Sequence, residues 1–412
     1  MIQKVVILST GDELTSGRVI DTNSAAIAER LFAMGIEVPI ILKVGVNKDQ
    51  LLWALRQAQA LGDSVIGTGG LGPTSDDLTT EAVAEFLGCN LRQNEQVARE
   101  LQQRFKERRI SWSANTLKQA MFPDGSTIIS NPVGTAPGFQ VRIRPDKTLL
   151  WLSGVPQEMM AMLEQTVLPW IERQRGEPAH AFSCTFKIHG VTEGRLDEML
   201  RPVHLGNHAR LSFRAHYPDL SLRLAVRTQS PDGSVLFKTI RNQIRIILGA
   251  YIYAEGDKTL EEVIGGLLVD KQQTLALAES CTGGYISHRV TRVAGSSAYY
   301  YGGAVTYSNE AKIKFLGVRP ETLEEHGAVS RETALEMSAG NKQRTGADVG
   351  LSVTGVAGPA GGSAAKPVGT VWVSIAQTES HEAKLFRFAG DREHVILGTS
   401  QVALNWLRTN LL

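Results

Sequence analysis

Short β-branched runs that stop at glycine or at a polar turn, each followed by a helical pattern, recur through the first 170 residues of this chain. "KVVILST" (4–10) ends at a polar turn and precedes "NSAAIAERLFAMG" (23–35), a helical pattern closed by Gly35. "DSVIGTGG" (63–70) runs into glycine and precedes the helical pattern "TTEAVAEFLG" (79–88). Strands that alternate with helices in this way predict an α/β domain, built on a parallel sheet with crossover helices.

Residues 175–255 follow a different pattern, which predicts a small α+β module. The expected order is a strand "AFSCTFKIHG", a helix "TEGRLDEML" and two paired strands, "ARLSFRAH" and "LSLRLAVRT". A second helix and a last strand, "AYIYAEG", complete the module. From about residue 258 the chain returns to α/β alternation, with a helix "TLEEVIGGLLVDK", strands "QTLALAE", "GADVGLSVTG", "VGTVWVSIAQ" and "AKLFRFAG", and a closing helix over 393–411. We therefore expect three domains, an α/β domain at 1–172, a small α+β domain at 173–256 and an α/β sandwich at 257–412.

The charge of the chain argues against a polyanionic partner. The formal net charge of the 412 residues is +1, so no field of the whole protein attracts nucleic acid or an anionic membrane. Arginines interleave with apolar residues in "LSFRAHYPDLSLRLAVRT" (211–228), which is one pattern of nucleic-acid binding. The same alternation is typical of a half-buried strand, and we favour that interpretation.

The sequence also predicts a cytoplasmic protein. No run approaches the ~18 apolar residues of a membrane-spanning helix, and the N-terminus lacks the pattern of a secretory leader. Cys89, Cys184 and Cys281 are odd in number, far apart and without metal-ligand spacing. We therefore expect neither a structural disulfide nor a zinc site.

Three glycine-containing loops of the N-terminal domain predict a site for a phosphorylated ligand. They are "STGDELTSGRVIDTNS" (9–24), "GTGGLGPTSDDLTTE" (67–81) and "NPVGTAPGF" (131–139), and the first two follow predicted strands, where α/β sheets bind ligands. Glycine lets backbone N–H groups approach an anion, and carboxylates beside phosphates suit a divalent cation. The carboxylates in these loops are Asp12, Glu13, Asp76, Asp77 and Glu81. The alternative is that Asp76, Asp77 and Thr79 cap a helix and the glycines serve turns.

In the C-terminal domain, Ser280 of "AESCTGG" (278–284) lies between a predicted strand and a glycine-led helix. That position suits an exposed hydroxyl and a set of N–H groups that stabilise an oxyanion. A serine needs a base to act as a nucleophile, and a buried lysine whose amine stays neutral can supply one. Lys312 of "VTYSNEAKIKFLGV" (305–318) is the best candidate, because His288 has no obvious partner acid. A capping serine and a surface lysine remain the alternative.

The N-terminal motifs "GDELTSGRVIDTNS" and "GGLGPTSDDLTTEAVAE" resemble signatures of the CinA (competence/damage-inducible protein A) family. The resemblance covers essentially the whole chain and implies a molybdopterin-binding-like N-terminal fold. It also implies metal-dependent hydrolysis of ADP-ribose to AMP and ribose 5-phosphate. The substrate-binding residues expected in this domain are Asn23, Gly69, Gly70, Gly72, Pro73, Thr74, Gly134 and Thr135. The expected ligands of a magnesium, manganese or cobalt ion are Asp12, Glu13, Asp76 and Asp77.

The C-terminal motifs are similar to those of the nicotinamide-nucleotide amidohydrolase domain of the same family, which converts nicotinamide mononucleotide and water to nicotinate mononucleotide and ammonia. The resemblance implies that Ser280 and Lys312 act with Tyr307, and that no metal or other cofactor is needed. Backbone N–H groups near Thr282, Gly283 and Gly284 are expected to hold the oxyanion. Thr354, Gly355 and Arg392 are expected to bind the rest of the nucleotide. The resemblance further implies a homodimer.

Two other functions remain open from the sequence. The chain could be a non-enzymatic protein that binds a molybdopterin-like ligand, or an accessory protein of competence or DNA repair. Alternatively, the N-terminal pyrophosphatase could be its main activity and the C-terminal domain secondary. Ala360, Ala365 and Ile396 depart from what relatives often carry in the last two motifs, so contacts there are weaker predictions than the Ser280, Tyr307 and Lys312 set.

Overall fold

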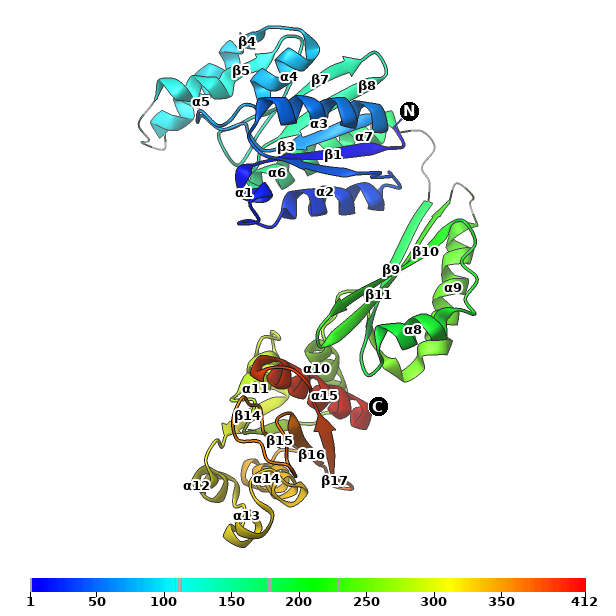
Figure 1. Cartoon of the computed structure of the whole chain (residues 1–412), viewed down its shortest axis with the longest axis vertical. Helices are drawn as coiled ribbons and strands as arrows, with labels where there is room; N and C mark the ends of the chain where they lie inside the picture. Colours follow the sequence, from blue (N-terminus) through cyan, green and yellow to red (C-terminus); the bar gives the residue numbers. More distant parts are fainter. Residues whose placement is uncertain are drawn as a thin grey trace. The chain divides into compact units, whose positions relative to one another are not determined.

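The computed structural model describes residues 2–107, 109, 111, 113–175, 180–228, 230 and 232–412 (Figure 1). The chain forms two compact units, Met1–Phe182 with Val226–Val235 and Ser183–Ala225 with Leu236–Leu412. Most of the predicted middle domain groups with the second unit, so the division into three domains stays a prediction. Among the described residues, no helix combines the length and the apolarity needed to cross a bilayer.

The first unit contains a six-stranded sheet in the order β2-β1-β3-β8-β7-β6. The strands are β1 (Val5–Thr10), β2 (Ile41–Val44), β3 (Ser64–Thr68), β6 (Thr127–Ile129), β7 (Gly138–Arg144) and β8 (Lys147–Leu152). β1, β2, β3 and β8 pair in parallel, as expected, whereas β7 is antiparallel to both of its neighbours, so the sheet is mixed. A separate ribbon pairs β4 (Leu91–Gln93) with β5 (Met121–Pro123).

Helices cover both faces of this sheet. They are α1 (Asp12–Thr15), α2 (Thr22–Ala33), α3 (Lys48–Leu61), α4 (Thr79–Leu87), α5 (Glu95–Glu107), α6 (Pro156–Met162) and α7 (Leu168–Gln174). Every residue of β1 is buried, with Val6 and Leu8 in one core cluster and Val5 and Ile7 in another. Figure 1 shows α3 and α2 on opposite sides of β1. A strand buried on both faces explains why "VVIL" is a continuous apolar run without alternation.

Most of the α+β module belongs to the second unit, and its elements follow the predicted order. Its elements are β9 (His180–Ile188), α8 (Glu193–Leu200), β10 (Ala209–His216), β11 (Asp219–Thr228), α9 (Gly233–Leu248) and β12 (Ile252–Glu255), with the sheet order β10-β11-β9-β12. Leu222 and Leu224 are buried, and Arg223 between them is exposed. The interleaved arginines therefore belong to a half-buried strand, as we favoured.

The last α/β part contains a five-stranded sheet in the order β14-β13-β15-β16-β17. The strands are β13 (Leu275–Glu279), β14 (Tyr300–Val305), β15 (Val349–Gly355), β16 (Thr370–Ala376) and β17 (His381–Arg387). β13 pairs in parallel with β14 and β15, and β16 is antiparallel to both neighbours. The sequence analysis did not identify β14, because Gly302 and Gly303 weaken its strand pattern.

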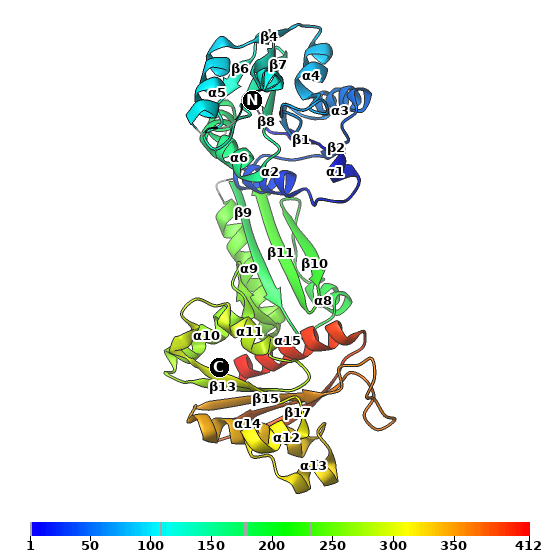
Figure 2. The ribbon, with the colours of Figure 1, turned by 90° about the vertical axis from the view of Figure 1, so that its left-hand side faces the viewer.

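Two layers of helices enclose this sheet. The helices are α10 (Leu260–Asp270), α11 (Tyr285–Thr291), α12 (Asn309–Ala311), α13 (Pro320–His326), α14 (Arg331–Thr345) and α15 (Arg392–Leu411), with a π-helical turn η5 (Lys312–Leu316) after α12. Figure 2 shows α10, α11 and α15 on one face of the sheet and α14 on the other. The sheet and α15 share a large core that includes Val353, Val373 and Leu404. The expected α/β sandwich is confirmed.

Candidate active site

Ser280 directly follows β13, the strand that lies between β14 and β15. Its backbone N–H donates to the carbonyl of Val353 at 3.1 Å, so the residue is fixed at the carboxyl edge of the sheet. The N-cap of α11 is Gly284, not Ser280. Gly283 and Gly284 have φ values of 61° and 96°, which let the chain turn sharply between Ser280 and α11. The serine is therefore not a helix cap.

Lys312 is buried and lies beside the serine. Its side chain is 1% exposed, and its Nζ lies 3.0 Å from Ser280 Oγ and donates to the carbonyl of Thr306 at 2.7 Å. Burial lowers the pKa of Lys312, because an ammonium group loses hydration there. A neutral amine at this position can accept the Ser280 proton. The surface-lysine alternative does not describe Lys312.

Glu279 holds the loop that follows Ser280, a role that the sequence analysis missed. Its carboxylate is 1% exposed and accepts five hydrogen bonds. The donors are the Thr282 hydroxyl, the amides of Gly284, Ile286 and Ser287, and the Ser287 hydroxyl, at 2.6 to 3.1 Å. An acidic residue at the end of an otherwise apolar strand was the available signal, since a buried carboxylate requires several donors.

The expected oxyanion donors are only partly placed at the serine. The Gly284 amide donates to Glu279, and the Gly283 amide donates to the carbonyl of Ser280 at 3.1 Å. Within the described residues, the amides of Cys281 and Thr282 donate to no other residue. These two amides, rather than those of the glycines, are therefore the backbone donors that remain for an oxyanion.

A cavity of about 280 Å³ opens over Ser280 and Lys312. Of the predicted substrate-binding residues, Thr354, Gly355 and Arg392 line it, whereas Thr282, Gly283 and Gly284 do not. The other lining residues are Cys281, Tyr307, Ala328, Val329, Val356, Ala357, Gly358, Ala360 and Gly361. Nothing in the sequence pointed to Ala328 and Val329, which reach the cavity only through the fold. The cavity is therefore lined by both a serine hydroxyl and an arginine side chain.

Tyr307 lies at the mouth of this cavity, with 62% of its surface exposed. Its hydroxyl accepts a hydrogen bond from Arg392 at 2.9 Å, and Arg392 also donates to the carbonyl of Gly358 at 2.8 Å. No hydrogen bond joins Tyr307 to Ser280 or Lys312 in the described part of the chain. The three predicted catalytic residues thus share one cavity, but only the serine and the lysine are in hydrogen-bond contact.

Cys281 is buried beside Ser280, and burial raises the pKa of its thiol to about 12. A thiol with so high a pKa forms very little thiolate at neutral pH. Of these two neighbouring side chains, the thiol is therefore the poorer candidate for a nucleophile.

The three N-terminal loops meet at the carboxyl edge of the first sheet. Asn23 is 8% exposed, and its amide group donates to Thr68 Oγ1 at 3.1 Å and to the carbonyl of Gly154 at 2.8 Å. The Gly69 amide donates to the carbonyl of Leu152 at 3.2 Å. Gly70 has a φ of 65°, and a Cβ there would lie 2.3 Å from Thr79 Oγ1. The glycines therefore permit close packing of these loops, while Pro73 and Thr74 are exposed at their rim.

The four predicted metal ligands do not form a cluster. Asp77 accepts hydrogen bonds from the backbone and the side chain of Thr74, and Asp12 accepts one from the Val46 amide at 2.7 Å. Glu13 and Asp76 are exposed. Within the described residues, no group of three or more His, Cys, Asp or Glu side chains is placed to hold a metal ion. This arrangement does not fit the divalent metal that the resemblance implies, and we derive no step through one.

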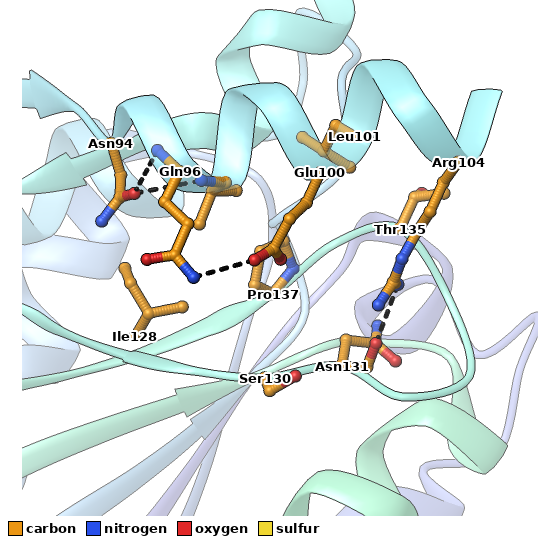
Figure 3. Close-up of a pocket in the computed structure, with 11 residues that line it drawn as sticks. Asn94, Gln96, Glu100, Leu101, Arg104, Ile128, Ser130, Asn131, Thr135 and Pro137 are labelled. Atoms are coloured by element: carbon orange, nitrogen blue, oxygen red, sulfur yellow. Dashed lines mark hydrogen bonds between the residues drawn. The ribbon is translucent and has the colours of Figure 1, made fainter. Parts of the chain in front are cut away.

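A second cavity, of about 250 Å³, lies between α5 and the loop after β6 (Figure 3). Gln96, Glu100 and Arg104 line it from α5, Ser130 and Asn131 lie opposite the helix, and Thr135 lines it beside Arg104. Arg104 donates to the carbonyls of Asn131 and Gly134, at 3.0 and 2.6 Å. These bonds hold the loop 131–139, which was predicted to bind a phosphorylated ligand, against α5. The Gly134 amide donates to Asn131 Oδ1 at 2.8 Å. The polar groups of this loop are thus largely engaged with one another.

Comparison with known proteins covers both parts of the chain. Residues 257–411 match the family model described as the CinA C-terminal domain, and residues 6–173 match the one described as a probable molybdopterin binding domain. A CinA-like protein of Geotalea daltonii is 43% identical over 413 residues, which span 99% of each chain. A putative competence-damage inducible protein of Halothermothrix orenii is 41% identical over 408 residues, 97% of each chain.

Two solved structures are similar in sequence over roughly one domain. A competence/damage inducible protein of Agrobacterium tumefaciens is 42% identical and matches 37% of this chain and 93% of its own, with a TM-score of 0.36. The competence damage-inducible protein A of Klebsiella pneumoniae is 39% identical and matches 37% and 98%, with a TM-score of 0.36. None of these names states a substrate.

Proposed function

This chain belongs to the CinA family, and we propose that its C-terminal domain hydrolyses the carboxamide of nicotinamide mononucleotide to give nicotinate mononucleotide and ammonia. The observation that carries the proposal is the buried Lys312 amine, 3.0 Å from the Ser280 hydroxyl. Burial favours the neutral amine, which is the form that can act as a base. The substrate class comes from the family resemblance, and the chemistry comes from these two side chains.

In the first step, Ser280 Oγ attacks the carboxamide carbon while its proton moves to Lys312 Nζ. The amides of Cys281 and Thr282 are the donors placed for the resulting oxyanion. The carbon–nitrogen bond then breaks, and ammonia leaves with the proton that Lys312 returns. A water molecule, deprotonated by Lys312, attacks the nicotinoyl ester and releases the acid and the free Ser280. Arg392 supplies a positive charge in the cavity for the anionic nucleotide.

The direct test is to incubate the full-length protein with nicotinamide mononucleotide and to measure ammonia and nicotinate mononucleotide. We expect release of both products in equal amounts and their loss in the Ser280→Ala variant. Ser297→Ala is the matched control, because Ser297 is exposed and outside the cavity. Brisk ammonia release by a folded Ser280→Ala protein would overturn the covalent mechanism. A wild-type protein without turnover would favour the non-enzymatic accessory role.

For the N-terminal domain we propose binding of a phosphorylated ligand at the edge where the three loops meet. The supporting observation is that Asn23 Oδ1 is buried there and has no hydrogen-bond partner among the described residues. Cleavage of ADP-ribose by this domain remains an expectation from the resemblance, because its four carboxylates are not gathered. Assay of the same protein preparation with ADP-ribose, with and without added divalent metal, tests that expectation separately.

A further inference from the structure

The tip of the β10–β11 hairpin, in the α+β module, contacts α15 of the C-terminal sandwich within the second unit (Figure 2). The Tyr217 hydroxyl donates to the carbonyl of His394 at 3.0 Å, and the two rings lie 5.1 Å apart. A Cβ at Gly398, one turn along α15, would lie 2.2 Å from the Tyr217 hydroxyl oxygen. Any larger residue at position 398 would therefore clash with the Tyr217 side chain.

The segment of α15 that Tyr217 contacts also carries the cationic residue of the cavity. Asp391 is the N-cap of α15 and accepts a hydrogen bond from the His394 amide at 2.9 Å. Arg392, the first residue of the helix, reaches the cavity and donates to Tyr307 and to the carbonyl of Gly358. The first turn of α15 is thus held by Tyr217 on one side and presents Arg392 to the substrate on the other.

A second set of hydrogen bonds links the same hairpin, through Gln401 of α15, to α11, the helix that follows Ser280. Asp219, next to the hairpin tip, accepts hydrogen bonds from Tyr253 and from Gln401 of α15. Gln401 accepts one from Arg289 of α11 at 2.7 Å, and Arg289 also pairs with Glu261. Gln401 is 0% exposed, so this network is internal to the unit. The hairpin therefore contacts α15, whose first residue Arg392 lines the cavity, and is linked through Gln401 to α11.

We propose that Tyr217 is a positioning residue for substrate binding, which acts by fixing the first turn of α15 and with it the Arg392 side chain. The proposal rests on the amidohydrolase function proposed above. Tyr217 lines no part of the cavity, and Ser280 and Lys312 are held by β13, β14 and η5 rather than by α15. Loss of the Tyr217 contact should therefore weaken substrate binding without slowing the chemical step.

The test compares steady-state kinetics of the full chain with nicotinamide mononucleotide for the wild type and for Tyr217→Phe, which removes only the hydroxyl. We expect KM to rise about fivefold, the value of one neutral hydrogen bond, and kcat to stay the same. Tyr251→Phe is the matched control, because Tyr251 is in the same module, is 40% exposed and has a side chain that bonds to no described residue. It should leave both constants unchanged.

A double-mutant cycle shows whether Tyr217 acts through Arg392. If it does, Tyr217→Phe should raise KM in the wild type but produce no further rise in an Arg392→Ala background, because the residue that it positions is gone. A full, additive increase in that background would overturn the proposal. So would a lower melting temperature of Tyr217→Phe with an unchanged KM, because that is the result of a merely structural contact.

Hydrogen exchange of the peptide over 391–399 gives a readout that does not depend on turnover. Faster exchange in Tyr217→Phe than in Tyr251→Phe is expected, since the first turn of α15 loses a contact. Equal exchange in the two variants would reject the positioning role even if the protein had no amidohydrolase activity. An inactive wild type with faster exchange would instead reject the proposed function alone.

Discussion

Both candidate sites lie where parallel strands of a sheet end, yet they use their polar side chains in opposite ways. At the C-terminal site, Glu279 accepts hydrogen bonds from the amides at the start of α11, and Ser280 and Lys312 face each other in a cavity. At the N-terminal site, Asp77 bonds to Thr74 and the loop after β6 bonds to itself and to Arg104. The position in the fold is shared, but of the two described sites it is the one at the five-stranded sheet that places a buried lysine amine beside a serine hydroxyl. An α/β edge indicates where ligands bind and not whether chemistry follows.

The largest expected effect is at the C-terminal pair. Ser280→Ala and Lys312→Ala should each reduce deamidation of nicotinamide mononucleotide at least about 1,000-fold, and the double variant should lose little more, because the two act as one unit. Any turnover of ADP-ribose should survive both changes. Ammonia release and ADP-ribose cleavage, assayed on the same preparations, check this. Parallel loss of both activities would contradict independent sites.

A smaller but still large effect is expected for the carboxylate that supports the nucleophile loop. In Glu279→Gln, an amide NH₂ replaces an oxygen that accepts hydrogen bonds, so two donors lose their acceptor and the loop should shift. We expect deamidation to fall about 100-fold, as for other misplaced reacting groups. Glu158→Gln is the matched control, because Glu158 accepts from Asn131 and Ser153 in the N-terminal unit. Deamidation at the wild-type rate in Glu279→Gln would show that the Glu279 carboxylate is not needed to position the loop after Ser280.

The pH profile of deamidation should follow the protonation state of the buried Lys312. The folded protein holds the pKa of Lys312 below its ordinary value of 10.5, and the active form is the neutral amine. The kcat/KM should therefore rise with pH and level off above an inflection that lies below 10.5, with activity lost as the pH falls through it. Initial rates measured from pH 6 to 10, about the range in which the protein should stay folded, give this curve. A rate that falls over this range would contradict a lysine base.

A modest effect on stability is expected at the N-terminal loops. Asp77→Ala removes the acceptor of the Thr74 amide and hydroxyl and should cost about 1 kcal/mol of the free energy of unfolding of that unit. Thermal unfolding without metal measures the loss of stability in the variant. The same experiment with magnesium, manganese or cobalt measures any stabilisation by a bound metal ion. A metal-dependent rise of the melting temperature in the wild type, absent from Asp77→Ala, would restore the predicted metal site.

The smallest effect is expected for Cys281→Ala. The thiol is buried with a pKa raised to about 12, so its loss should leave deamidation within about twofold of the wild type. Steady-state rates and iodoacetamide sensitivity check this. Inactivation of the wild type by the reagent, with protection in Cys281→Ala, would show that the thiol takes part.

Strand and helix alternation predicted most of the fold, because apolar runs ended by glycine are local signals. β14 was missed, since Gly302 and Gly303 are stabilised there by pairing with β13 rather than by their own preference. Lys312 could be proposed from the sequence, but its burial could not, because it depends on the fold around η5. Tyr307 was expected to act with Ser280 and Lys312, but its hydrogen bond to Arg392, 85 residues along the chain, could not be read from the sequence, because it depends on the fold.

The carboxylates of the N-terminal loops show that residues close together in the sequence need not form a site in the fold. Asp76 and Asp77 are neighbours in the sequence, but adjacent side chains need not converge on one point. Asp77 turns back to Thr74, and Asp12 turns to Val46, because each satisfies a nearby backbone amide. Because these hydrogen bonds hold the carboxylates apart in the structure, the metal site expected from their clustering in the sequence stays a prediction.

The position of Lys312 beside Ser280 depends on the edge strand β14. The amide of Thr306, directly after β14, donates to the carbonyl of Glu279 at 2.8 Å, and the carbonyl of Thr306 accepts from Lys312. The pairing of β14 with β13 therefore helps to hold the Lys312 amine beside the Ser280 hydroxyl. An edge strand, held on one side alone, is the least protected part of a sheet against local opening. Local opening of β14 should therefore separate the Lys312 amine from the Ser280 hydroxyl and abolish the proposed deamidation while the other strands of the sheet stay paired.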